Sequence, residues 1–98
     1  MATYTELFEL RQDAGLLNKI TTAIAIKSKN VIDGAGTAGQ KDWAREAINN
    51  PSGVSEKVIW FMLVANKDNS IAQIQGANDS AVQANTDVAI DDLISGLV

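Results

Sequence analysis

The stretch VIWFMLVA, Val58–Ala65, limits most strongly how this chain can fold. Eight consecutive apolar residues lie between Lys57 and Asn66, whereas polar groups interrupt the rest of the chain every few residues. As a helix, the run is apolar on nearly every side, which is typical of a helix buried on most of its faces. As a strand it would need a partner, because an isolated strand leaves its backbone groups without hydrogen bonds, and no second strand is evident. The run therefore predicts a central apolar helix around 54–66.

Helix-start signals divide the rest of the chain into short segments. The candidate N-caps are Thr3, Asp13, Thr37, Asn50, Ser70, and Asn78 or Ser80. Pro51 suits a first helical position, and Gly96 is a plausible helix stop. Ninety-eight residues with 46% apolar content make one domain, because two separate cores would each be too small. We predict an all-α fold, a compact bundle of four to six short helices, as a single domain over 1–98.

Two of the expected helices carry an apolar stripe at helical spacing. The earlier stripe consists of Leu16, Leu17, Ile20, Ala23, Ile24, Lys27 and Val31. Ile26 lies off this stripe and suggests a second contact. The stripe of the last helix consists of Val82, Thr86, Ala89, Ile90, Leu93, Ile94 and Leu97. On that helix Asp87, Asp91 and Asp92 are expected to face elsewhere.

The composition excludes most catalytic and metal-binding sites, because the chain has neither histidine nor cysteine. Ser/His/Asp and Cys/His catalysis are therefore excluded, and the commonest transition-metal ligands are missing. Asp87 and Asp91 are four residues apart, and such carboxylate pairs can act as acid and base when burial separates their pKa values. Beside an apolar stripe on a terminal helix, a solvated face is the simpler interpretation. We expect no catalytic residue, no metal site, no cofactor and no enzymatic activity.

Gly34, Gly36 and Gly39 match the G-x-G-x-x-G pattern of dinucleotide-binding proteins. That chemistry needs a strand before the glycines and a helix N-terminus after them. The residues before Gly34 have a helical pattern instead, and no alternation of strands and helices follows. The glycines therefore indicate a loop between two helices.

Charge is unevenly distributed along the chain. Residues 1–67 hold all eight basic and seven acidic residues, whereas residues 68–98 hold five aspartates and no lysine or arginine. This acidic segment argues against direct nucleic-acid readout. It either faces a basic partner or keeps the surface solvated. The opening MATYTELFEL lacks the pattern of a signal peptide, and no apolar run approaches the length of a membrane span.

The tryptophans are the residues most suited to contact with another protein. Trp43 and Trp60 are interpreted either as core residues or as contact residues. Of the two, Trp60 is the stronger candidate for a contact residue, because it lies with Ile59 and Leu63 on the second side of an already apolar helix. The candidate interaction residues are Trp60, Ile59, Leu63, Asp87, Asp91 and Asp92.

Three segments, MATYTELFELRQDAGLLNKI, WAREAINNPSG and WFMLVANKDNSIAQIQGANDSAVQ, resemble a group of short proteins encoded by tailed bacteriophages. Those proteins also start Met-Ala-x-Tyr-x-Glu-Leu and carry an apolar, Trp-containing helix ending in Ala-Asn-Lys-Asp. The resemblance covers nearly the whole chain and implies a structural or assembly role in the virion, without assigning site residues.

That role predicts a non-enzymatic protein of the head–tail connector or capsid, assembled in the host cytoplasm. Its partners would be portal, capsid or tail components, and a homo-oligomeric ring would bury part of its apolar surface. The alternative is a small phage effector that inhibits a host protein through its acidic face. A virion component is expected in a symmetric copy number per particle, and an effector is expected to be absent from purified particles.

Overall fold

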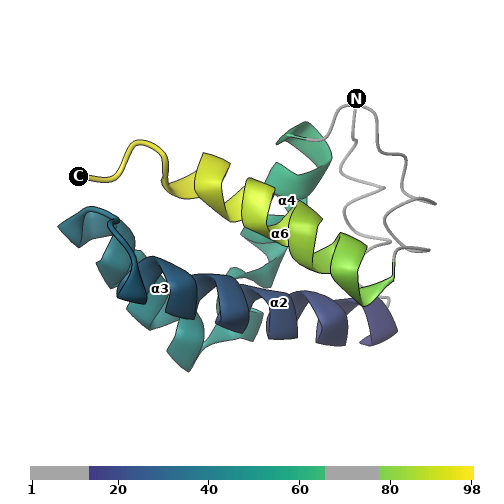
Figure 1. Ribbon diagram of the computed structural model, residues 1–98. Coiled ribbons are helices and arrows are strands. Elements are labelled where there is room, and N and C mark those ends of the chain that lie inside the picture. The colour runs from purple at the N-terminus through teal and green to yellow at the C-terminus, as the bar shows by residue number, and fades with distance from the viewer. Residues whose placement is uncertain (1–13, 66–77) are drawn as a thin grey trace.

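The computed structural model describes residues 14–65, with 63–65 as backbone only, and residues 78–98. These two segments form the helices α2 (Ala14–Asp33), α3 (Ala38–Asn49), α4 (Pro51–Ala65) and α6 (Asp79–Ile94), shown in Figure 1. Neither segment contains a strand, so the prediction of an all-α fold is confirmed for this part of the chain. The Cα radius of gyration is 12.6 Å, close to the value of about 13 Å for a compact chain of 100 residues. The predicted helix starts at Thr3, Asp13 and Ser70 lie outside the described residues.

Capping side chains fix where the helices begin. Thr37 and Gln40 form the predicted capping box, in which each side chain accepts a hydrogen bond from the other residue's backbone N–H. Asn50 separates α3 from α4, and its side chain accepts a hydrogen bond of 3.2 Å from the N–H of Gly53. Of the two caps proposed for the last helix, Asn78 is the one used, because its side chain accepts from the N–H of Ala81. Local sequence signals therefore determine these boundaries.

The apolar run Val58–Ala65 is helical along its whole length, so the strand alternative is excluded. Val58 and Ile59 have no exposed surface, and Met62 has almost none. Partly buried side chains of the same helix, Val54, Trp60 and Phe61, pack against the core. Apolar side chains around most of α4 thus contribute to the core.

Helices α2 and α6 lie side by side and run in the same direction (Figure 1). Three contacts define this parallel register, because Lys19 lies near Asp79, Ala23 near Gln83, and Lys27 near Asp91. The stripes predicted for both helices supply most of the core. The buried apolar residues are Leu16, Ile20, Ala23, Ile24, Ala44, Ala47, Val58, Ile59, Met62, Val82, Ala89, Ile90 and Ile94.

Two members of the predicted stripes do not belong to the apolar core. The Lys27 side chain is only 17% exposed, but its ammonium group reaches Asp91 at the surface. Leu97 is 38% exposed, because α6 ends at Ile94 and the helical spacing no longer applies beyond it. The helix stop proposed at Gly96 lies in the turn that follows Ile94.

An exposed ion pair lies at the C-terminal end of α2. Lys29 Nζ donates a hydrogen bond of 2.6 Å to Asp33 Oδ2, one helical turn further on. This hydrogen bond and the charge of Asp33 raise the pKa of the Lys29 ammonium group above its usual value. Lys29 is therefore fully charged at neutral pH.

Two hydroxyl groups are buried within the described structure without a hydrogen-bond partner, those of Ser28 and Thr86. An unsatisfied buried hydroxyl costs about 1–3 kcal/mol. Thr86→Val, which replaces the hydroxyl with a methyl group of similar size, is therefore expected to raise the free energy of unfolding by about 1 kcal/mol. Urea unfolding followed by circular dichroism measures this change.

Thr22→Val is the matched control for Thr86→Val. The Thr22 side chain is exposed and donates to the carbonyl of Asn18, so its replacement is expected to change stability by less than about 0.5 kcal/mol. A lower stability for Thr86→Val would contradict the idea that its hydroxyl lacks a partner.

Candidate protein-interaction surface

A row of polar contacts joins α2 to α6 along their shared edge. Gln83 Nε2 donates to the backbone oxygen of Ala23 at 3.1 Å and to Asp87 Oδ1 at 2.7 Å. Further along, Lys27 Nζ lies 2.8 Å from Asp91 Oδ1. With the Lys19–Asp79 pair, these contacts form a row along Lys19, Ala23 and Lys27 of α2, which are four residues apart and therefore lie on one face of that helix.

The three aspartates predicted as interaction residues therefore differ in their surroundings. The Asp91 carboxylate is paired with Lys27, and the Asp87 carboxylate accepts a hydrogen bond from Gln83. Asp92 is exposed, and its carboxylate has no hydrogen bond or ion pair with the described residues. Two of the three are thus engaged with the edge facing α2, and Asp92 remains available at the surface.

The outer face of α6 consists of Ala84, Val88 and Asp92, which are four residues apart and all exposed. Val88 is 48% exposed, a high value for a large apolar side chain in the middle of a helix. An isolated exposed apolar residue needs no special explanation, but the position of Val88 beside Asp92 produces a mixed apolar and acidic face. Of these three residues, only Asp92 was predicted from the sequence to lie away from the buried stripe, and Val88 was not singled out.

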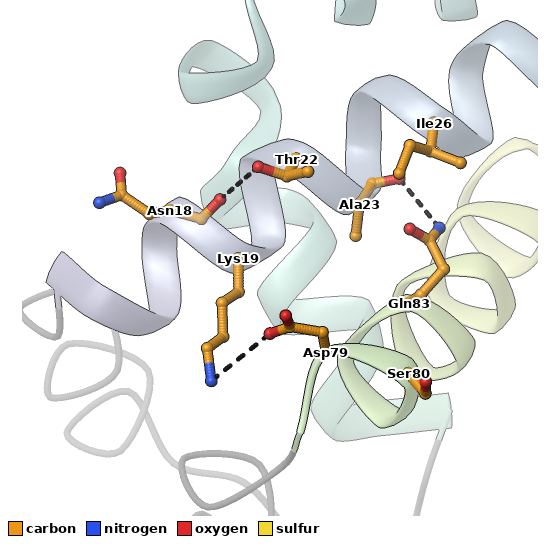
Figure 2. Close-up of a pocket in the computed structure, with 8 residues that line it drawn as sticks. All are labelled: Asn18, Lys19, Thr22, Ala23, Ile26, Asp79, Ser80 and Gln83. Atoms are coloured by element: carbon orange, nitrogen blue, oxygen red, sulfur yellow. Dashed lines mark hydrogen bonds and ion pairs between the residues drawn. The ribbon is translucent and has the colours of Figure 1, made fainter.

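A groove of about 680 Å³ opens between the middle of α2 and the N-terminal half of α6 (Figure 2). Ile26, half exposed, forms part of one wall, in agreement with its predicted position off the buried stripe. Lys19 Nζ lies 3.7 Å from Asp79 Oδ1 at the surface, where such a pair contributes little to stability. The lining residues are Asn18, Lys19, Thr22, Ala23, Ile26, Asp79, Ser80 and Gln83.

The groove is better suited to contact with another protein than to catalysis. Its lining offers amide and hydroxyl groups and one pair of opposite charges, with no cysteine or histidine. No local pattern indicates the groove itself, because the groove depends on the register between two helices about 60 positions apart. The one sequence feature that pointed to this region was Ile26, an apolar residue outside the core stripe.

The predicted contact face on α4 is only partly at the surface. Ile59 is fully buried and belongs to the core, in one cluster with residues of α2, α3 and α6. Trp60 is half-buried and packs against the core, which agrees with the core interpretation for much of its ring. The side chain of Leu63 lies outside the described residues. Of the three, Trp60 alone is known to have exposed surface.

The glycine pattern lies between two helices. Gly34 follows α2 directly, Gly36 lies in the connecting loop, and Gly39 belongs to the first turn of α3. The helix before Gly34 replaces the strand that dinucleotide binding requires. The interpretation as an interhelical loop is confirmed for Gly34 and Gly36, whereas Gly39 is helical. Within residues 14–65 and 78–98, no group of three or more acidic side chains is placed to hold a metal ion.

None of the four described helices is both long and apolar enough to cross a membrane.

Comparison of the chain with protein-family models, curated proteins and solved structures finds no match.

Proposed function

We propose that this chain is a non-enzymatic structural protein of a tailed-phage virion, which acts by protein–protein contact at the head–tail connector or capsid. It needs no cofactor, and it assembles in the host cytoplasm with portal, capsid or tail components. The observation that carries the proposal is the resemblance of three segments, which lie between Met1 and Gln83, to short phage-encoded proteins.

The surface of α6 supports a contact role. Val88 and Asp92 on its outer face combine an apolar side chain with a carboxylate that no described residue neutralises. The neighbouring groove adds a second half-exposed apolar residue, Ile26, on the adjoining helix. Protein interfaces commonly combine an apolar centre with a polar rim. This surface is therefore the part of the molecule we assign to a partner.

The proposal also covers the fold of the whole chain. All 98 residues would form one domain, a compact bundle of four to six short helices around a central helix over 54–66. The burial of Val58, Ile59 and Met62 supports a central position for α4. In a ring, subunits of this kind would meet through two different patches of the same chain.

The mass of the protein in solution tests the proposed ring. Light scattering over a range of concentrations is expected to give a closed oligomer of about six or twelve subunits, as for symmetric assemblies. Val88→Asp, which places a second carboxylate beside Asp92, is expected to shift the mass toward the monomer. Val98→Asp is the control, because Val98 is 95% exposed and lies outside the outer face of α6. A wild-type monomer at all concentrations would contradict self-assembly.

The second candidate is an effector that binds a host protein through an acidic face. It is favoured by α6, which carries four aspartates and no lysine or arginine. Against it, Asp79 and Asp91 already pair with Lys19 and Lys27, so fewer charges remain for a partner. Quantitative mass spectrometry of purified particles separates the two functions. A fixed, symmetric copy number supports the virion protein, and absence from particles supports the effector.

A further inference from the structure

The segment after α6 is attached to the first turn of α3. The hydroxyl of Thr37 donates to the backbone oxygen of Leu97 at 2.8 Å, and the N–H of Gly39 donates to that of Val98 at 3.1 Å. The side-chain amide of Gln40 donates to the backbone oxygen of Ile94 at 3.2 Å. Three donors at the start of one helix thus hold the end of another, more than 50 residues away in the sequence.

The two capping-box residues serve both helices at once. The Thr37 hydroxyl accepts from the N–H of Gln40 while it donates to Leu97. The Gln40 side chain accepts from the N–H of Thr37 through its oxygen while its nitrogen donates to Ile94. Gly39 completes the junction, because its N–H belongs to the first helical turn and has no partner within α3. The groups that start α3 therefore also satisfy the carbonyl group of Ile94 at the end of α6 and those of Leu97 and Val98 beyond it.

No residue of this segment belongs to the buried core. Val98 is 95% exposed and Leu97 is 38% exposed, and the core cluster includes no residue beyond Ile94. Hydrogen bonds at the surface compete with water, and their net contribution is similar in size to the entropy lost when a few residues are ordered. Detachment of such a segment therefore costs much less free energy than global unfolding.

We propose that Ser95–Val98 acts as a latch that opens and closes on the first turn of α3 while the core remains folded. Opening releases the carbonyl groups of Ile94, Leu97 and Val98 and frees the donors of Thr37, Gly39 and Gln40. The latch thereby controls whether α3 and the end of α6 move together. This inference does not depend on the proposed virion role.

Gly39 is the position at which the latch can be tested without damage to the core. A Cβ atom on Gly39 would lie 2.5 Å from the backbone oxygen of Val98, so Gly39→Ala forces the latch away. Gly96 lies within the latch itself, and a Cβ atom there would meet nothing within 4 Å. Neither glycine has a positive φ angle, so alanine is compatible with both backbones. Gly96→Ala is therefore the matched control.

Amide hydrogen exchange measured by NMR reports the latch directly, because the residue-39 N–H is protected by Val98. With protection factors corrected for intrinsic rates, we expect about a tenfold or greater loss of protection at residue 39 in Gly39→Ala. Core amides of α2 and α4 are expected to keep their protection, and Gly96→Ala is expected to match the wild type at residue 39.

Two results would overturn the latch. An unprotected Gly39 amide in the wild-type protein would mean that the segment is not attached. Equal loss of protection across α2, α4 and α6 in Gly39→Ala would mean that the contact is part of the global fold, with no separate opening.

Discussion

Ile24→Ala is expected to lower the free energy of unfolding by about 2–5 kcal/mol. Ile24 has no exposed surface and lies within the cluster formed by α2, α4 and α6. Its truncation removes apolar contacts and leaves a cavity that rigid neighbouring helices can fill only in part. Because a small domain has about 5–15 kcal/mol of stability in total, this single change is expected to remove a large share of it. Urea unfolding of the wild type and of the variant measures the difference in the free energy of unfolding.

Ile26→Ala provides the control for that experiment. The two isoleucines are on the same helix and two residues apart, but Ile26 is half exposed in the groove. Its truncation is expected to change stability by less than about 0.5 kcal/mol. Equal losses for the two variants would contradict the assignment of Ile24 to the core and Ile26 to the surface.

Ala47→Leu is expected to destabilise the fold by about 1–3 kcal/mol. Ala47 is fully buried at the contact of α3 with the core, and a larger side chain there must push α3 away or adopt a strained rotamer. Thermal unfolding followed by circular dichroism is the measurement.

Ala84→Leu is the comparison for this variant. Ala84 lies in the middle of α6 on its exposed outer face, so the larger leucine side chain extends into solvent. The melting temperature is expected to stay within a few degrees of the wild type, in keeping with the small difference in helix propensity between alanine and leucine. A similar fall in both melting temperatures would show that Ala47 is not a tightly packed position.

The parts of the fold that the sequence predicted depend on local physics. Thr37 and Gln40 form their capping box within four residues of chain, and Asn50 and Asn78 cap helices through neighbours three residues away. The helical state of Val58–Ala65 follows from its length and from the lack of a partner strand. Such features leave direct signals in residue type and spacing.

The candidate site was less predictable, because it depends on pairing between distant segments. Lys27 was grouped with an apolar stripe, although its charged end reaches Asp91 on another helix. Ile59 was assigned to a contact face, although neighbouring helices enclose it. The groove beside Ile26 and the attachment of Leu97 to Thr37 involve residues about 60 positions apart. Helical spacing shows which face of a helix is apolar, but it does not show which helix covers that face.

The parallel direction of α2 and α6 has a consequence for how the chain reaches its native state. Two neighbouring antiparallel helices can meet through a short turn, whereas these two can meet only after the chain from Gly34 to Asn78 has returned to the end where α2 began. Closing so long a loop costs entropy before any contact between the helices compensates for it. Contacts of this sequence separation slow folding relative to bundles built from adjacent hairpins. We therefore expect the pairing of α2 with α6, and with it the formation of the groove, to come late in folding.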